Sequence, residues 1–166
     1  MIIKKAYNEA KTMADNFAEY PKSFLFFGAP GTGKTFLSGC IATALMNKGY
    51  SVLYITSAKL FEIMENKKYS RPRNENDDEL IETAYTCDLL ILDDLGAEPP
   101  SKLAPSFVYD ILNERMMAEK KMVINSNLDP DQLSAMYTQR FVSRFFEHFY
   151  ALKLTGKDIR KQKMYE

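Results

Sequence analysis

The chain opens with a pattern of apolar residues that predicts a helix, a strand and a second helix in turn. In residues 2–19, apolar side chains recur at spacings of three and four, so one face of a helix is apolar until Pro21 ends it. Residues 23–27 form a short apolar run of the kind that is buried on both faces in a parallel sheet. Helical spacing returns over residues 34–48, and Gly49 is a typical stop signal.

The alternation of strand and helix continues along the rest of the chain. Residues 66–79 interrupt it with many charged side chains, which we expect to form a surface excursion. Strands that alternate with helices predict an α/β domain with a mainly parallel sheet and right-handed crossovers. We expect Ser57 to cap the helix that it begins. The further strands are expected at 52–55, 88–92, 122–125 and 150–154, and the further helices at 57–65, 80–86, 106–120, 139–146 and after Asp129-Pro130.

The composition is that of a folded protein of ordinary size. The 166 residues are 46% hydrophobic and 27% charged, which is typical of a globular domain. We therefore expect a single domain over residues 1–166, with an N-terminal helix at 1–20 and an α/β core at 21–166. Lys plus Arg and Asp plus Glu number 22 each, so the chain has no overall basic field. Any contact with nucleic acid is therefore expected to be local.

The sequence also bears on where the protein works. No stretch reaches the roughly 20 apolar residues that a membrane span needs, and no apolar run of signal-peptide length follows Met1. Cys40 and Cys87 lie far apart without the spacing of a metal site, so we expect both to be small core residues. These patterns predict a cytoplasmic protein that is neither exported nor inserted into a membrane.

The strongest chemical motif lies between the first strand and the second helix. It satisfies G-x-x-x-x-G-K-[ST] in the strand–loop–helix setting that this motif requires. Glycines let successive backbone N–H groups point at a phosphate, and the N-terminus of the following helix adds positive potential. Lys34 would reach the β- and γ-phosphates of ATP, and the Thr35 hydroxyl would bind Mg²⁺. The residues of this phosphate-binding loop, or P-loop, are Gly28, Ala29, Pro30, Gly31, Thr32, Gly33, Lys34 and Thr35.

Two adjacent acids follow the buried aliphatic run of the third strand. In an open α/β sheet the carboxyl end of a strand faces the ligand, so Asp93 and Asp94 are expected beside the P-loop. Asp93 would hold Mg²⁺, usually through water, and Asp94 would orient or deprotonate the attacking water. Asp94 is one methylene shorter than the glutamate usual at this position, so Glu98 is an alternative for that role.

Further polar residues extend the predicted site. After the fourth strand, an amide could sense the γ-phosphate or hold the attacking water, and we choose Asn127 with Asn125 as the alternative. Arg140 and Arg144 are four residues apart and so share one helix face. A guanidinium can stabilise charge on a transferring phosphoryl group, although the spacing suits a solvated or salt-bridged pair at least as well.

Taken together, these stretches resemble the AAA+ ATPases of the bacterial helicase-loader family, DnaC and DnaI, and the related transposition helper IstB. The similarity runs through nearly the whole chain. The strings Asp-Asp-Leu-Gly-Ala-Glu at 93–98 and Gly-x-Asp-x-Arg at 156–160 are more specific than the P-loop, which many ATPases share. The other strings that carry the similarity lie at 26–37, 51–55, 126–128 and 140–144.

The resemblance implies both a fold and a set of roles. The fold is a three-layer AAA+ core of P-loop type, with a five-stranded sheet in the order 5-1-4-3-2 and a reduced or absent helical lid. Asn127 would be the first sensor, and Arg144 or Arg140 would be an arginine finger that acts on a neighbouring subunit. Arg160 is a candidate substitute for the second sensor arginine of the lid. The resemblance further implies that ATP-bound subunits self-associate around single-stranded DNA and place the replicative DNA helicase on it.

One stretch of the sequence suits local contact with DNA. Residues 67–73 combine four cations with Tyr69, which could meet phosphates and a base, although the acids that follow weigh against this.

Three other functions stay open besides an ATP-hydrolysing helicase loader. A transposition helper ATPase would share nearly every motif. A small P-loop kinase would need an arginine-rich lid, which the sequence does not display. A non-hydrolysing ATP-binding adaptor would follow if Asp94 does not act as the second acid.

Overall fold

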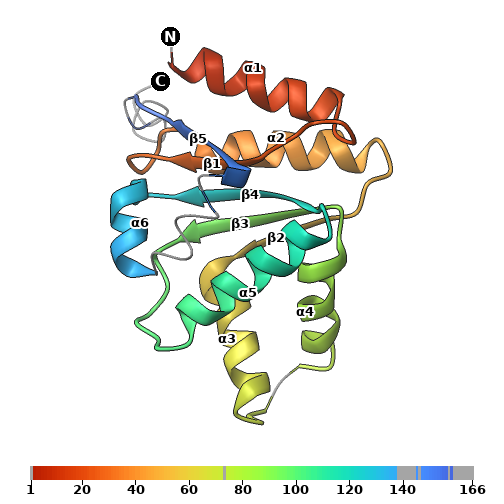
Figure 1. Cartoon of the computed structure of the whole chain (residues 1–166), viewed down its shortest axis with the longest axis vertical. Helices are drawn as coiled ribbons and strands as arrows, with labels where there is room; N and C mark the ends of the chain where they lie inside the picture. Colours follow the sequence, from red (N-terminus) through yellow and green to blue (C-terminus); the bar gives the residue numbers. More distant parts are fainter. Residues whose placement is uncertain (1, 73, 138–144, 146, 157, 159–166) are drawn as a thin grey trace, which may run out of the picture.

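Five parallel strands form the centre of the molecule (Figure 1). The computed structural model describes residues 2–72, 74–137, 145, 147–156 and 158. The strand order β2-β3-β4-β1-β5 is the predicted order read from the opposite edge, so the predicted sheet is confirmed. The strands are β1 (Ser23–Phe27), β2 (Val52–Thr56), β3 (Leu89–Leu95), β4 (Lys121–Ser126) and β5 (Phe149–Lys153); the helices are α1 (Ile2–Asp15), α2 (Lys34–Met46), α3 (Ser57–Lys68), α4 (Asp77–Thr86), α5 (Ala104–Met117) and α6 (Pro130–Met136).

Helices cover both faces of the sheet and make the three layers that were predicted. Figure 1 shows α1 and α2 above the sheet and α3, α4 and α5 below it. On the upper face Phe24 of β1 packs in a buried cluster with Ile41 of α2. On the lower face Leu90 of β3 packs in a second cluster with Ile111 of α5. Because successive side chains of a strand point to opposite faces, the apolar strands fill both clusters at once.

The charged stretch at 66–79 is only partly the surface excursion that was predicted. Lys67 and Lys68 belong to the last turn of α3, and Asp77 opens a first turn of α4 that carries three acids. Cations at a helix C-terminus and acids at an N-terminus both interact favourably with the helix dipole. The charges therefore extend two helices, and the connection between them is shorter than expected.

Two predictions about single residues were wrong. The N-cap of α3 is Thr56, whose hydroxyl accepts the Lys59 N–H at 3.3 Å, whereas Ser57 lies inside the helix and is buried. Cys87 is buried as expected, but Cys40 is exposed because it lies on the outward face of α2. None of the helices in the described part of the chain is long and apolar enough to cross a membrane.

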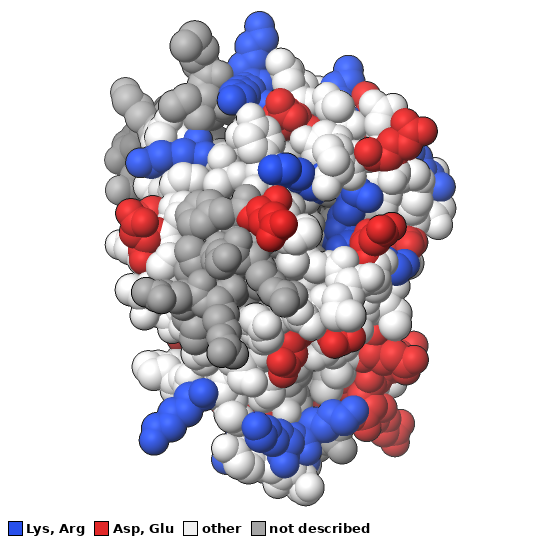
Figure 2. Space-filling model, in the orientation of Figure 1, with Lys and Arg blue, Asp and Glu red and all other residues white. Residues whose placement is uncertain are grey.

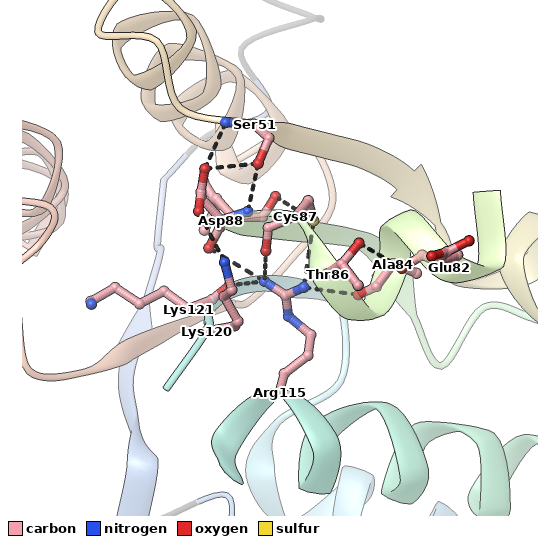
Figure 3. A network of polar contacts seen from close by, with 10 residues as sticks. Ser51, Glu82, Ala84, Thr86, Cys87, Asp88, Arg115, Lys120 and Lys121 are labelled. Carbon is pink, nitrogen blue, oxygen red and sulfur yellow. Dashed lines mark hydrogen bonds and ion pairs between the residues drawn. The ribbon is translucent and has the colours of Figure 1, made fainter. Parts of the chain in front are cut away.

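A buried arginine joins the elements that meet at the amino ends of the central strands (Figure 3). Arg115 of α5 is 0% exposed, and nothing in the sequence pattern marked it. Its guanidinium donates to the carbonyl of Ala84 in α4 at 2.9 Å, to that of Cys87 at 3.0 Å and to that of Lys121 in β4 at 2.7 Å. Beside it, hydrogen bonds from the Ser51 side chain and backbone lower the pKa of Asp88 to about 2. Arg115 therefore satisfies carbonyls that the ends of α4 and β4 leave in the interior.

Candidate functional site

The P-loop connects the end of β1 to the start of α2. Its backbone takes positive φ at Gly28 (133°), Gly31 (76°) and Gly33 (94°). A Cβ at Gly28 would lie 2.3 Å from the carbonyl oxygen of Leu154, and a Cβ at Gly31 would lie 2.0 Å from a carboxylate oxygen of Asp158. Gly28 therefore requires glycine because the backbone that follows β5 passes directly against it, and Gly31 favours glycine because of its positive φ.

The loop ends at the N-terminus of α2 without a side chain that caps it. Gly33 is the N-cap, and it supplies no side-chain hydrogen bond to the first turn. The N–H groups of a first helical turn have no partner within the helix, so they are available to an anion. Within the loop, the buried Thr32 hydroxyl donates to the Ala29 carbonyl at 2.9 Å and stabilises the curled backbone.

Lys34 lies folded into the P-loop with only 5% of its surface exposed. Its ammonium donates to the carbonyls of Gly28 at 2.7 Å and Ala29 at 2.9 Å, and to the side-chain oxygen of Asn127 at 2.8 Å. The positive charge is thus held at the centre of the loop. The contact with Asn127 joins the P-loop to the end of β4, so the structure brings these two predicted residues together.

Asp93 and Asp94 end up in different surroundings because β3 contains a bulge. The pairing of β3 with β4 shifts between Leu92 and Leu95, and both of these leucines face the lower core. Asp93 points to the upper face and is 5% exposed. Asp94 has φ 55° and is exposed to solvent. Aspartate tolerates this left-handed conformation better than most residues, which is a physical reason for the shorter acid at this position.

The Asp93 carboxylate is fixed by donors from several elements. Its Oδ1 accepts from the side chain of Asn125 at 2.9 Å and lies 3.5 Å from the Thr35 hydroxyl of the P-loop. Its Oδ2 accepts from the hydroxyl of Tyr54 on β2 at 2.7 Å. Burial and this hydrogen bond raise the pKa of Tyr54 above its usual value, so the phenol stays protonated and donates.

The two asparagines of β4 and the loop after it have different partners. Asn125 is fully buried; it accepts from the Ser38 hydroxyl of α2 at 2.8 Å and donates to Asp93. Asn127 contacts the ammonium of Lys34 at the surface of the P-loop. Asn125 therefore joins α2, β3 and β4 beneath the site, whereas Asn127 is exposed beside Lys34, and its role as a sensor stays a prediction.

Glu98 is buried in a network of its own. It accepts from the Ser57 hydroxyl and from the Gly96 N–H, both at 2.8 Å, and from the hydroxyl of Tyr137. Burial and the hydrogen bond to Glu98 raise the pKa of Tyr137 above its usual value. Glu98 thus links the loop after β3 to α3 and to the end of α6, while Asp94 remains the exposed acid.

Several predicted residues are not placed beside this site. Arg140, Arg144 and Arg160 lie outside the described residues, so their roles stay predictions. Three cations of the DNA-contact hypothesis, Lys67, Lys68 and Arg71, lie near the far end of α3, and Arg73 lies outside the described residues. Figure 2 shows basic side chains at the lower tip of the molecule with acidic side chains beside them. There Lys67 is paired with Asp78 at 2.9 Å, as the neighbouring acids suggested.

Sequence reasoning missed the residues that support the predicted site. Tyr54 donates to the carboxylate of Asp93 in β3, Ser38 donates to the side chain of Asn125 in β4, and Ser57 donates to the carbonyl of Asp94. For Tyr54 and Ser38 a weak signal existed, since each is a polar group within a mostly apolar strand or helix. Their partners could not have been inferred, because the contacts join residues 39 and 87 positions apart.

The fold and this arrangement together define an ATP-binding P-loop domain of the AAA+ class. This class combines a P-loop after β1, two acids near the carboxyl end of β3 and an asparagine after β4. The chain belongs to the family of IstB-like ATP binding proteins, which it matches over residues 7–166.

Curated relatives point to replication proteins. The chain is 29% identical over 141 residues to the replicative helicase loader DnaC of Buchnera aphidicola subsp. Acyrthosiphon pisum (strain APS), a match that covers 85% of this chain and 57% of the relative. It is 26% identical over 163 residues to DnaC of Escherichia coli (strain K12), with 92% and 66% covered. The chain thus spans somewhat more than half the length of these relatives.

Solved structures show the same fold. A crystal structure of the DnaC helicase loader superposes with a TM-score of 0.78 at 22% identity, covering 92% of this chain and 89% of that one. The replication initiator DnaA, bound to AMPPCP and single-stranded DNA, superposes with a TM-score of 0.74 at 25% identity, covering 96% of this chain and 50% of that one.

Proposed function

We propose that this protein binds ATP with Mg²⁺, hydrolyses it, and uses the cycle to load the replicative helicase onto single-stranded DNA. The main support for the proposal is that the P-loop, Asp93, Asp94 and Asn127 lie together at the carboxyl ends of the parallel strands. Lys34 supplies a buried positive charge at the loop, and no side chain caps the N-terminus of α2, so a triphosphate would meet both a charge and the N-terminus of a helix.

Thr35 and Asp93 would hold the magnesium ion. Their oxygens lie 3.5 Å apart, one on the P-loop helix and one at the end of β3, and both are the hard oxygen ligands that Mg²⁺ prefers. The residues therefore fit the ion. When bound, Mg²⁺ neutralises charge on the phosphates.

Asp94 would orient the attacking water and accept its proton, because it is the exposed acid next to the metal ligand. Asn127 would sense the γ-phosphate through its contact with Lys34. Arg144 or Arg140 would reach the phosphates of a neighbouring subunit, so turnover would depend on self-association. The DNA and helicase partners would place this activity in the cytoplasm.

The loader role is supported by the DnaC relatives and by the likeness to DnaA bound to single-stranded DNA. Contact with DNA at the tip of α3 is part of this proposal, although the pairing of Lys67 with Asp78 weakens it. The family match favours one second candidate, a transposition helper ATPase of the IstB type. Nothing in the described residues supports a small P-loop kinase.

The test uses single-stranded DNA coated with its binding protein, an annealed oligonucleotide and the replicative helicase from the same cell. Release of the oligonucleotide should require this protein and ATP. Lys34→Ala should abolish the release and weaken ATP binding by roughly 10- to 100-fold, because it removes a charged donor to phosphate. Lys102→Ala, which removes an exposed lysine, should do neither.

A protein that binds ATP but neither contacts the helicase nor supports release would contradict the loader role. If the same preparation stimulates strand transfer by a transposase encoded beside it, the helper role is supported instead. Unchanged ATP affinity in Lys34→Ala would contradict the site itself.

A further inference from the structure

The chain that follows β5 places an acid against the P-loop. The backbone N–H of Leu154 donates to the carbonyl of Phe27 at 2.7 Å, so this segment continues beside the end of β1. Further along, the side chain of Asp158 lies against Gly31. A Cβ added to Gly31 would be 2.0 Å and 2.6 Å from the two carboxylate oxygens of Asp158 and 2.1 Å from the carbon between them. The whole carboxylate therefore fills the space beside Gly31.

This part of the P-loop has a positive potential. Gly31 is followed closely by the buried ammonium of Lys34 and by the N-terminus of α2. Both attract anions, whether the anion is a phosphate or a carboxylate. A phosphate held by N–H groups of this loop would lie within roughly 8 Å of the Asp158 carboxylate, because N–H···O distances are about 3 Å. The acid and a bound phosphate would therefore share one positive potential at close range.

We infer that Asp158 limits nucleotide affinity, because its negative charge repels phosphates on the P-loop and competes with them for the positive potential there. The inference rests on the proposed function, since it concerns the same nucleotide site. Two like charges roughly 8 Å apart near a protein surface repel each other by more than the thermal energy. Asp158 is only partly buried, so salt in the solvent should weaken this repulsion.

The test compares the equilibrium binding of a fluorescent ATP analogue, with Mg²⁺, to the wild-type protein and to Asp158→Asn. Asparagine keeps the size and shape of the side chain and removes its charge. At low salt the Kd of the variant should be about tenfold lower than that of the wild type. The ratio of the two Kd values should decrease as NaCl is raised to about 1 M, because salt screens charges. Relief of a steric obstacle would give a ratio that does not depend on salt.

Asp110→Asn is the matched control. Asp110 is exposed on α5, which covers the opposite face of the sheet from α2 (Figure 1), so the same charge is removed on the other side of the sheet. This variant should bind the analogue with the wild-type Kd at every salt concentration. Thermal unfolding without nucleotide checks that both variants are folded.

An equal or higher Kd in Asp158→Asn would overturn the inference, as would a lower Kd whose ratio to the wild-type value does not change with salt. Either result would leave the proposed function standing, because binding that Lys34→Ala weakens would still mark the P-loop as the site. If the wild-type protein bound no ATP analogue at any salt concentration, the proposed function and this inference would fall together.

Discussion

Asp93 and Asp94 are neighbours in sequence, yet the bulge in β3 separates their surroundings. Asp93 is buried among donors, and Asp94 is exposed in a left-handed conformation. Glu98, which the sequence left as an alternative to Asp94, is buried under hydrogen bonds from α3, α6 and its own loop. A carboxylate with its oxygens engaged in this way is a poor acceptor for a proton from water. The exposure and contacts of these acids therefore favour Asp94 as the proposed acid that acts on water.

Asp94→Asn should slow ATP hydrolysis by roughly 100-fold or more, because the general base is lost while the phosphate contacts remain. ATP affinity should be nearly unchanged. Steady-state phosphate release and equilibrium nucleotide binding measure the two effects separately.

Glu98→Gln serves as the comparison for this prediction. We expect it to lower the thermal unfolding temperature and to retain most of the turnover, because it disturbs a buried network rather than the reacting groups. Full activity in Asp94→Asn together with a folded but inactive Glu98→Gln would reverse the assignment.

At the scale of elements, the site depends on how the strand ends are aligned. β1, β3 and β4 are parallel, so the P-loop, Asp93 and Asn127 lie together at the carboxyl ends of these strands. At the amino ends, hydrogen bonds from Arg115 connect α5 to the end of α4 and to the start of β4. Polar groups therefore lie at both ends of the central strands: the proposed nucleotide site at the carboxyl ends and the Arg115 hydrogen bonds at the amino ends.

Arg115→Met should lower the free energy of unfolding by about 3 kcal/mol, because it leaves buried carbonyls without a donor. Methionine keeps the aliphatic part of the side chain, so the loss comes mainly from the guanidinium and its hydrogen bonds. Urea unfolding followed by circular dichroism measures the change.

Arg71→Met is the matched control, since Arg71 is exposed near the end of α3. It should change the free energy of unfolding by less than about 0.5 kcal/mol. An Arg115 variant as stable as this control would show that water satisfies the carbonyls instead.

At the scale of the whole molecule, the nucleotide site is proposed to be completed by a second copy of the chain. The described residues supply the P-loop, the proposed metal ligands Thr35 and Asp93 and the proposed sensor Asn127, whereas the proposed finger arginines would come from the neighbour. In the proposed arrangement, hydrolysis would occur only in assembled subunits, as the proposed loader role requires.

Arg144→Ala should reduce ATP turnover by about 1,000-fold or more if it removes an arginine finger. Mixing this variant with Lys34→Ala should recover part of the activity, because the second variant offers an intact finger to the first variant's intact P-loop. Phosphate release is measured across a series of mixing ratios, with Arg140→Ala mixed in the same way. A mixture no more active than its components would argue against action between subunits.

The sequence by itself determined the α/β class, the strand order through its resemblance to a family, and the position of the P-loop. The class and the position of the P-loop follow from local signals, because apolar runs, helical spacing and glycine motifs are encoded over a few residues. The ends of α3 and α4 were misjudged because charged side chains suit both a loop and a helix terminus.

Only the tertiary structure decided which polar residues meet. The structure shows that Asn127 contacts Lys34, whereas Asn125 is buried beneath the site. It shows that Asp94 is exposed and that Glu98 is buried. It also shows that Tyr54 donates a hydrogen bond to Asp93. The physical reason is that these contacts join strands and loops far apart in sequence. A bulge or a single turn changes the direction of a side chain, so a local sequence pattern does not show which distant residue it contacts.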